Sequence, residues 1–333
     1  MKDVPLPQNC TEHIYFIGGL YGVDNPFFGT TITPYELLTN LGLKTSRVLE
    51  SCTRYIAFDV NEFELEKVVR YGISKSNRFL LRFEAEIVWP KNYQSKVIDN
   101  YGTLITFGKM YPDEGLGEAW PQFWDNEINL PRSNHERFNQ TVFINSNKIS
   151  LIKGELYSLR KRAILDVKSL SIYGRGWDKS TIANMVEFIR AVKFSLRNKK
   201  IPNLSSWFAY AKVPKHYLGS VDNKNSTLEM YKTALVIENS FDLVTEKIFD
   251  CFFSGTYPVY IGPDLTNFGI PPDLYTSCAP DIFSIRSALF NAQAIDFEKW
   301  MGSLQEWLNS NKTISTWHYR HVFSRIVSKI DVS

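Results

Sequence analysis

Residues 233–263, TALVIENSFDLVTEKIFDCFFSGTYPVYIGP, constrain the fold more than any other part of the sequence. They begin with an apolar, β-branched run at 233–237, which is typical of a strand buried on both faces. Polar residues interrupt the run, and Thr245 is then placed to cap a helix that would end near Gly255. A second apolar run at 257–261 predicts another strand. The segment therefore predicts a strand–helix–strand unit whose polar residues gather where the first strand ends and the helix begins.

Geometry predicts that these polar residues form a site. Two strands joined by a helix of this length are normally parallel, so their carboxyl ends and the helix N-terminus meet at one edge of the sheet. The residues expected at that edge are Glu238, Asn239, Thr245, Glu246, Lys247 and Gly262. Lys247 would be unfavourable in a first helical turn unless an anion such as a diphosphate bound there. The alternative is an ordinary βαβ unit with a solvated Glu–Lys pair.

The composition is that of a globular protein long enough for two domains. The formal charge of +3 on 333 residues is too small to predict nucleic-acid or membrane binding by itself, and no nucleic-acid partner is expected. No apolar run reaches the roughly 18 residues of a transmembrane helix. The four cysteines are scattered and form no CxxC pair, so neither a zinc site nor a disulfide framework is expected. This cysteine pattern favours a cytoplasmic protein.

Strands and helices alternate along the rest of the chain, which predicts an α/β fold. Strands are expected at 13–18, 54–60, 78–83, 101–107, 141–144, 169–173 and near Ile282, and helices at 34–41, 63–71, 155–167, 180–196, 296–308 and 314–330. Residues 113–137 are predicted to form a long loop. The expected domains are an N-terminal α/β domain at 1–145, a C-terminal α/β domain at 146–300, and a helical segment at 301–333 that would pack back on the first domain.

ENSFDLVTEK followed by SGTYPVYIGP resembles the donor-binding signature of the α-1,3-fucosyltransferases. That family carries Glu-Asn-Ser, Asp-Tyr-Val-Thr-Glu-Lys and Gly-x-x-Pro-Val-x-x-Gly-Pro elements at similar spacing. YKTALVIENS, IYGRGWD and FEAEIVWP also resemble family elements, in the expected order. The resemblance implies the GT-B type of α/β fold, with two Rossmann-like domains facing a central cleft. It also implies GDP-fucose as donor, a glycan acceptor, inverting transfer, and no required metal or cofactor. The domain at 1–145 would then be the acceptor side, and the domain at 146–300 would bind the nucleotide-sugar donor.

The resemblance assigns roles to the polar residues of the strand–helix–strand unit. Lys247 matches the family lysine that contacts the diphosphate, and Glu246 matches the glutamate that holds the ribose. Glu238 and Asn239 match the pair that lines the fucose and phosphate region. One position departs from the pattern, because Leu243 stands where the family has a tyrosine that touches the donor, and the interval before it is shorter.

Two further donor contacts are implied from elsewhere in the chain. Arg160 matches the arginine that reaches the diphosphate, and a helix beginning near Ser158 would place it at the same sheet edge. Arg162 is its rival, about half a turn away, so only one of the two should face the site. Tyr173, at the end of another predicted strand, resembles the tyrosine of the family's Tyr-Gly turn near the nucleotide.

Inverting transfer needs a base that takes the proton of the acceptor hydroxyl. Glu84, in RFEAEIVWP, matches the family glutamate proposed for that role. Glu86 is the competitor, because both side chains would share one face if a strand continued through them. His318 and His321 have helical spacing but no evident third metal ligand, which favours a packed or solvated helix face.

The sequence leaves three functions open. The first is transfer of L-fucose to a GlcNAc- or glucose-containing glycan, with an α-1,3 linkage expected. The second keeps the fold but uses another nucleotide-linked sugar. The third is a nucleotide- or glycan-binding protein that has lost catalysis. The joint presence of the expected base and donor-binding residues argues against this third function.

Overall fold

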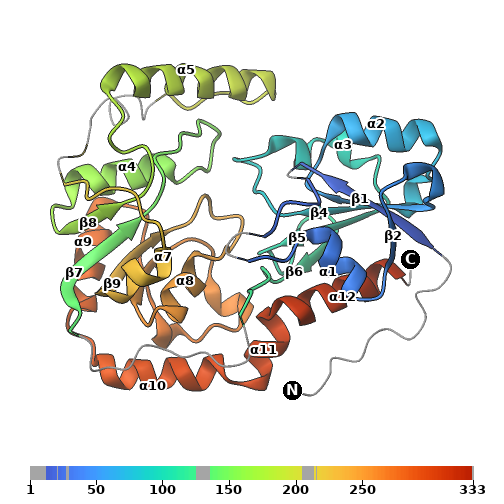
Figure 1. The fold of residues 1–333 in the computed structure, drawn as a ribbon. Coiled ribbons are helices and arrows are strands. Elements are labelled where there is room, and N and C mark those ends of the chain that lie inside the picture. The colour runs from blue at the N-terminus through green and yellow to red at the C-terminus, as the bar shows by residue number, and fades with distance from the viewer. Residues whose placement is uncertain are drawn as a thin grey trace. The chain divides into compact units, whose positions relative to one another are not determined.

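The computed structural model describes residues 13–20, 22–27, 30–124, 136–204, 214 and 216–331. Contacts divide the chain into two compact units: unit 1 comprises Met1–Asn126 and Asn311–Ser333, and unit 2 comprises Glu127–Ser310. Each unit contains its own sheet flanked by helices (Figure 1). No helix in the described part of the chain combines the length and apolar character needed to span a membrane.

Unit 1 is built on a six-stranded parallel sheet with the strand order β2-β1-β3-β4-β5-β6. Its strands are β1 (Ile14–Gly19), β2 (Lys44–Ser46), β3 (Arg54–Phe58), β4 (Arg78–Arg82), β5 (Thr103–Phe107) and β6 (Leu116–Glu118). Its helices are α1 (Pro34–Asn40), α2 (Glu62–Tyr71), α3 (Ser95–Ile98), α11 (Asn311–Trp317) and α12 (Tyr319–Asp331). The central strands β3 and β4 are buried along their whole length, as expected for parallel strands covered on both faces.

The two shortest strands of unit 1 were not expected from the sequence. β2 and β6 have three residues each and no alternating or continuous apolar pattern. β6 also lies within the segment at 113–137 that was expected to be a loop. Both strands occupy sheet edges, so their pairing depends on the neighbouring strand rather than on their own composition.

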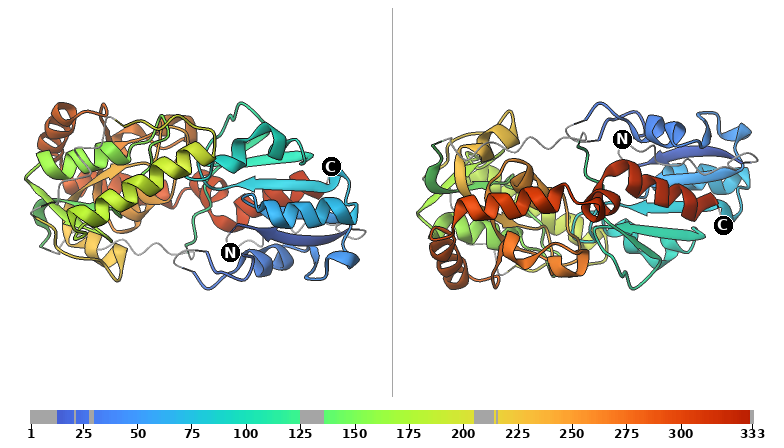
Figure 2. Two further views of the ribbon diagram at one scale, coloured as in Figure 1. Left: turned by 90° about the horizontal axis from the view of Figure 1, so that it is seen from above. Right: turned by 90° about the horizontal axis from the view of Figure 1, so that it is seen from below.

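The C-terminal helix α12 lies beside the sheet of unit 1 (Figure 2). Charged side chains bind it to that sheet. The buried Glu118 carboxylate, at the end of β6, accepts hydrogen bonds from Arg325 at 2.6 Å and Lys329 at 3.1 Å. Arg54 of β3 donates to the carbonyl of Ile330 at 2.5 Å. These bonds satisfy groups that would be costly to bury alone, so they fix the helix against the strands.

The single helix expected at 314–330 is wrong, because the structure has two helices there. The backbone of Gln122 donates to the carbonyl of Trp317 at 2.8 Å and accepts from the amide of Tyr319 at 2.9 Å. Gln122 and His318 thereby form a parallel β-bridge. The bridge gives the Trp317 carbonyl a partner outside the helix and separates α11 from α12.

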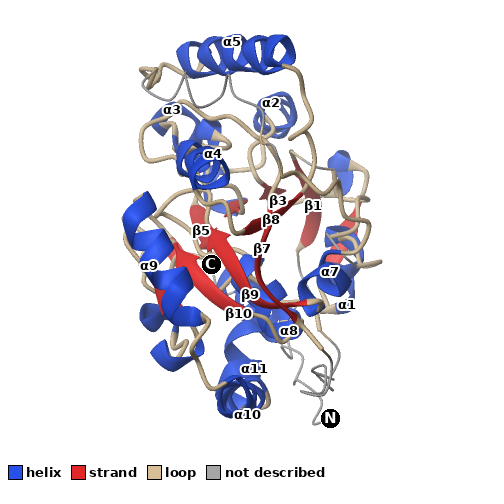
Figure 3. Cartoon of the chain, turned by 90° about the vertical axis from the view of Figure 1, so that its left-hand side faces the viewer, coloured by secondary structure: helices blue, strands red, loops and turns tan. Residues whose placement is uncertain are grey.

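Unit 2 is built on a five-stranded parallel sheet with the order β11-β10-β9-β7-β8. Its strands are β7 (Phe138–Ile144), β8 (Leu170–Tyr173), β9 (Tyr231–Ile237), β10 (Tyr257–Ile261) and β11 (Thr276–Ser277). Its helices are α4 (Tyr157–Asp166), α5 (Thr181–Arg197), α7 (Lys224–Glu229), α8 (Lys247–Phe253), α9 (Ile282–Ala292) and α10 (Phe297–Leu308). Figure 3 shows α9 on one side of this sheet and α7 and α8 on the other.

The strand expected near Ile282 is wrong, because α9 begins at that residue. The Asp281 side chain caps this helix by accepting from the Ser284 amide at 2.9 Å. Aspartate is a favoured N-cap residue, and here this helix-start signal outweighs the short apolar run. The strand that pairs with β10 is the two-residue β11, a few residues earlier.

Candidate functional site

The polar residues of the strand–helix–strand unit meet at the carboxyl edge of the unit 2 sheet. β9 and β10 are parallel and in register from Thr233–Tyr257 to Ile237–Ile261, so both end at the same edge. Glu238 follows β9 directly and is 0% exposed. Its carboxylate accepts from the Thr245 amide at 3.0 Å, the Thr245 hydroxyl at 2.8 Å and the Lys247 ammonium at 3.1 Å.

Thr245 does not cap the helix. The N-cap of α8 is Glu246, without a side-chain hydrogen bond, and Thr245 instead donates to Glu238 and accepts from Lys247 at 2.7 Å. The buried carboxylate takes the threonine hydroxyl because an unpaired buried charge costs more free energy than an uncapped helix end. α8 has only seven residues, so the positive side chains, rather than the helix end, carry the case for anion binding.

Lys247 lies among acidic side chains, which explains how a lysine is accommodated at the start of a helix. Its ammonium is 3.1 Å from Glu238 and 4.0 Å from Glu246. Lys224, from α7, forms a second ion pair with Asp250 of α8. Burial raises the pKa of Glu246, but Lys247 and Lys224 outweigh it and lower that pKa to about 2. The Glu246 carboxyl is therefore ionised at neutral pH, in a form that accepts hydrogen bonds from hydroxyl groups.

Arg160 is brought to the same edge and Arg162 is not. Arg160 is buried and donates twice to the carbonyl of Ile237, the last residue of β9, at 2.6 and 3.1 Å. It also donates to the Asn239 side-chain oxygen at 2.9 Å. Arg162 is exposed. The guanidinium of Arg160 therefore terminates β9 and orients Asn239.

Lys224 contributes to this edge although sequence reasoning did not select it. A cavity of about 20 Å³ lies beneath the edge, large enough for roughly one water molecule. It is lined by Ile144, Asn145, Lys224, Leu228, Ala234, Leu235, Val236, Lys247 and Cys251. Lys224 stands in a helix that the sequence did not predict, and no local pattern marks it as part of the site.

Position 262, directly after β10, has no room for a residue larger than glycine. A Cβ atom at this position would lie 2.4 Å from the Tyr260 hydroxyl oxygen and 2.7 Å from Glu238 Cγ. Tyr260 is buried beside Glu238, and both burial and that carboxylate raise the pKa of its hydroxyl well above the ordinary value. The glycine therefore allows β10 to end against the buried carboxylate.

Tyr173 is the last residue of β8, at the carboxyl edge of the sheet, but its hydroxyl contacts the start of β9 and not the Glu238 cluster. Its hydroxyl lies 3.0 Å from that of Tyr231, the first residue of β9, whereas Glu238 follows the last. Burial and the neighbouring Tyr231 raise the pKa of Tyr173 to about 12. Leu243 is buried, so the residue in the place of the family tyrosine is part of the core.

In unit 1, Glu84 and Glu86 do not lie on one strand. β4 ends at Arg82, and both glutamates belong to the partly exposed loop that follows. The condition for a shared face, a strand that continues through both residues, is therefore not met, and the alternation argument does not place their side chains on one face. Tyr93 donates to the Glu84 carbonyl at 3.3 Å.

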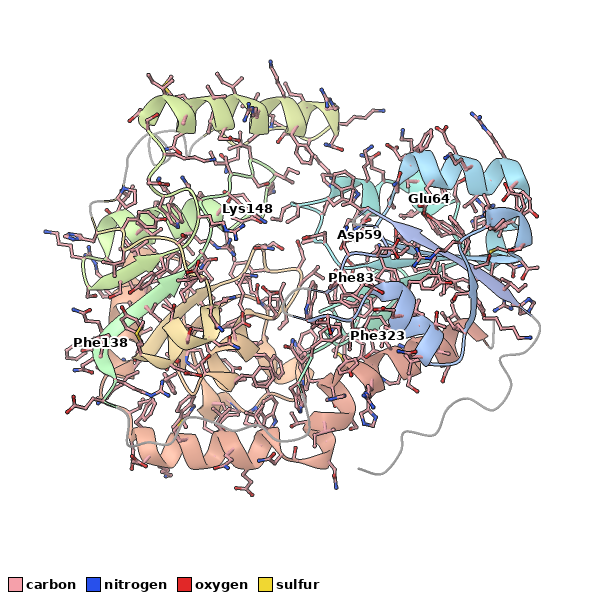
Figure 4. All side chains as sticks on the ribbon, in the orientation of Figure 1. Asp59, Glu64, Phe83, Phe138, Lys148 and Phe323 are labelled. Carbon is pink, nitrogen blue, oxygen red and sulfur yellow. The ribbon has the colours of Figure 1, made fainter. Side chains whose placement is uncertain are left out.

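Asp59 holds this loop, and sequence reasoning did not select it. It follows β3 with a φ of 57°, a left-handed conformation that aspartate tolerates better than most residues. Its Oδ1 accepts from the amides of Phe83 at 2.8 Å and Glu84 at 3.2 Å, and from the Asn92 side chain at 2.5 Å (Figure 4). Asn92 also accepts from the Val60 amide at 2.9 Å. The sequence pattern that could have identified Asp59 is an aspartate directly after an apolar strand.

Asp59 is a buried carboxyl with an unusual protonation equilibrium. It is 0% exposed, and its Oδ2 has no hydrogen-bond partner within the described residues. Burial and the charge of Glu84 raise its pKa to about 7, although its hydrogen bonds oppose the shift. The carboxyl that fixes the Glu84 backbone therefore changes protonation close to neutral pH.

His318 makes structural contacts. Its Nε2 is 2.8 Å from the Trp124 carbonyl oxygen, and its ring packs edge-on against that tryptophan. Within the described ranges, no group of three or more His, Cys, Asp or Glu side chains could hold a metal ion. Burial and Arg325 lower the pKa of His321.

No family model matches this sequence, and no curated protein does. Solved structures do resemble the fold. A crystal structure of an α1,3-fucosyltransferase matches with a TM-score of 0.55 and 12% identity, over 99% of this chain and 93% of the other. The same kind of enzyme with GDP matches with a TM-score of 0.54 and 13% identity, over 99% and 94%. The Anabaena protein HepE with UDP and glucose matches with a TM-score of 0.54 and 8% identity, over 97% and 100%.

These similarities extend over nearly the whole of each chain, but the identities are low. They establish the fold rather than the family. The two parallel sheets with their flanking helices form an α/β fold of the GT-B type.

Proposed function

We propose that this protein is an inverting glycosyltransferase that moves L-fucose from GDP-fucose to a hydroxyl of a GlcNAc- or glucose-containing glycan, with an α-1,3 linkage. The ENSFDLVTEK signature and the glycosyltransferase fold support this proposal. A solved α1,3-fucosyltransferase with GDP-fucose has a similar fold, at a TM-score of 0.50 and 13% identity. We expect a cytosolic enzyme with no metal requirement.

The observation that carries the proposal is the state of Lys247. Its side chain is only 15% exposed, and Glu238 and Thr245 take two of its three N–H donors in the described structure. Glu246, at 4.0 Å, is beyond hydrogen-bond distance of the ammonium, so within the described residues the third donor is left for a ligand oxygen. A preoriented ammonium with one donor remaining suits an oxygen of a diphosphate. Such a contact would hold the bound nucleotide and would stabilise its negative charge as it departs.

The neighbouring residues would complete the donor site. The ionised Glu246 carboxylate accepts hydroxyl hydrogens, which fits the proposed ribose contact. Arg160 orients the Asn239 side chain and adds positive charge near the diphosphate. Tyr173 is retained as a proposed nucleotide contact.

The reaction would be a single in-line displacement. The bond between the anomeric carbon and the diphosphate oxygen breaks as the bond to the acceptor oxygen forms, and the acceptor proton passes to a carboxylate. We assign that base to Glu84, whose backbone amide is held by Asp59. Lys247 would stabilise the charge that develops on the departing GDP.

A second candidate keeps the chemistry but changes the donor sugar or nucleotide. It is favoured by the buried position of Leu243, since the family tyrosine that touches the donor is absent from the site. The Anabaena HepE structure contains UDP and glucose on a similar fold.

Donor binding separates these candidates. The melting temperature should rise with GDP and not with equal concentrations of UDP or ADP. A rise with UDP alone would refute the GDP-fucose proposal and favour the second candidate. Turnover of GDP-fucose and other nucleotide sugars over a glycan array would then identify the transferred sugar and the acceptor.

Substitutions test the assigned roles. Lys247→Met should weaken GDP binding about tenfold to a hundredfold, since one charge-assisted hydrogen bond is lost. Lys232→Met is the matched control, because Lys232 is exposed on β9. Glu84→Gln should lower turnover by about 10² to 10⁴ without changing GDP binding, whereas Glu86→Gln should not. The reverse pattern would transfer the role of base to Glu86.

A further inference from the structure

Helix α5 presents an apolar face to solvent. Figure 1 shows α5 at the outer surface of unit 2, with no described helix or strand of that unit on its outward side. Its apolar outward residues are between 38% and 74% exposed: Ile182, Met185, Val186, Ile189 and Leu196. The opposite face is buried through Asn184, Phe188, Ala191 and Ser195. Core packing therefore explains only half of the apolar character of this helix.

The exposed apolar residues form a stripe along one side of the helix, which Lys193 interrupts between Ile189 and Leu196. Positions 182, 185, 186, 189 and 196 follow the helical spacing of i, i+3, i+4, i+7 and i+14, which places them along one side of the cylinder. A solvent-facing helix side is normally polar, and contiguous exposed apolar surface marks an interaction site. Leu151, packed against Phe188 and Ala191, fixes the helix to unit 2 from behind, so the stripe cannot turn inward.

Positive charge lies within and beside the stripe. Arg190, Lys193 and Arg197 are exposed at i, i+3 and i+7 spacing, and Lys199 is exposed just beyond the helix. The acidic residue of α5, Glu187, is paired with Arg190 at 3.0 Å and with a lysine outside the helix at 3.5 Å. The surface is therefore both apolar and cationic.

We propose that α5 lies flat on an anionic lipid bilayer. The apolar stripe would enter the boundary between headgroups and acyl chains, and Arg190, Lys193 and Arg197 would contact lipid phosphates. A basic helix with apolar side chains along its exposed side has the composition of such interfacial helices. This surface is separate from the proposed donor site and does not depend on it.

The same features argue against other partners. Nucleic acid would be attracted by the cations but would leave the aliphatic stripe exposed to water. A second copy of this chain could cover the stripe, but its α5 offers the cations no free anionic partner, because Glu187 is already paired with Arg190. A bilayer with anionic headgroups satisfies both the apolar and the cationic side chains.

Vesicle sedimentation of the full chain tests the proposal. The protein should sediment with phosphatidylcholine vesicles that contain phosphatidylglycerol and much less with pure phosphatidylcholine, and salt should weaken the binding. The double variant Ile189→Glu, Leu196→Glu should bind about tenfold more weakly or worse. Neutralising Arg190, Lys193 and Arg197 with glutamine should remove the preference for anionic vesicles.

A matched control separates the stripe from general surface hydrophobicity. Phe283 of α9 is 82% exposed, so Phe283→Glu should leave vesicle binding unchanged. All these positions are exposed, so the melting temperature should also be unchanged. Equal vesicle binding by the double variant and the wild type would overturn the proposal. An α5-dependent dimer seen by light scattering, without vesicle binding, would overturn it in favour of self-association.

Discussion

The buried Asp59 makes the stability of unit 1 depend on pH in a direction opposite to that of most carboxyl groups. Its pKa is about 7 in the folded chain, against an ordinary value of 3.8. Between these two values the folded state binds a proton that the unfolded state does not. The free energy of unfolding therefore falls as pH rises from about 4 to about 7, as the carboxyl ionises without solvent.

The magnitude follows from the two pKa values. Linkage predicts that Asp59 contributes about 2.5 kcal/mol more stability near pH 5 than near pH 8. Asp59→Asn removes the titration but keeps an oxygen that can accept from the amides of Phe83 and Glu84. The difference in unfolding free energy between wild type and Asp59→Asn should therefore change by about this amount between the two pH values.

Urea unfolding of both proteins across this pH range measures the difference, and groups common to both cancel. Asp99→Asn, at an exposed position of the same unit, is the control and should show no such dependence. The reasoning would be refuted if the difference in unfolding free energy between wild type and Asp59→Asn stayed constant to within about 0.5 kcal/mol from pH 5 to pH 8. It would mean that Asp59 is solvated or paired in a way that keeps its ordinary pKa.

Three further substitutions test local packing and charge. Gly262→Ala should cost about 1 to 3 kcal/mol of unfolding free energy, because its methyl group would overlap the Tyr260 hydroxyl; wild-type stability in urea would contradict this. Arg325→Met should cost about 1 to 2 kcal/mol, because Lys329 remains as a partner of the buried Glu118; an unchanged melting temperature would show that this pair contributes nothing. Lys161 is buried over an indole ring and its ammonium has no hydrogen-bond partner in the described structure, so burial lowers its pKa to about 8. Lys161→Met should therefore stabilise the protein by about 1 to 3 kcal/mol near neutral pH and by less near pH 10, and stabilisation that grows with pH would exclude this explanation.

The local sequence was sufficient to predict a helix or strand whose backbone hydrogen bonds do not compete with those of a distant segment. The apolar run at 257–261 became β10, and the periodic segment at 180–196 became α5, with Ser180 as its cap. It was insufficient where a distant segment competes for backbone hydrogen bonds. The break between α11 and α12 arises from Gln122, nearly 200 positions earlier, and no helical periodicity could reveal it.

The candidate site shows the same division. The residues that follow β9 could be identified from strand topology, because parallel strands end at one edge. Their partners could not: Thr245 looked like a cap and instead binds Glu238, and Asp59 holds a loop more than twenty residues away. These hydrogen-bond partners depend on which carboxylates are buried, and the packing of the whole fold determines that burial.

By itself, the sequence determined that the chain is an α/β protein with a polar strand–helix junction at residues 238–247, because apolar periodicity and strand direction are local properties. The tertiary structure alone decided which charges meet there. It buried Glu238 so that Lys247 has a fixed partner, turned Arg160 inward and Arg162 outward, and left the apolar stripe of α5 uncovered. The physical reason is that the energy of a charge or an apolar side chain depends on the solvent it loses, and that loss is set by residues far away in the sequence.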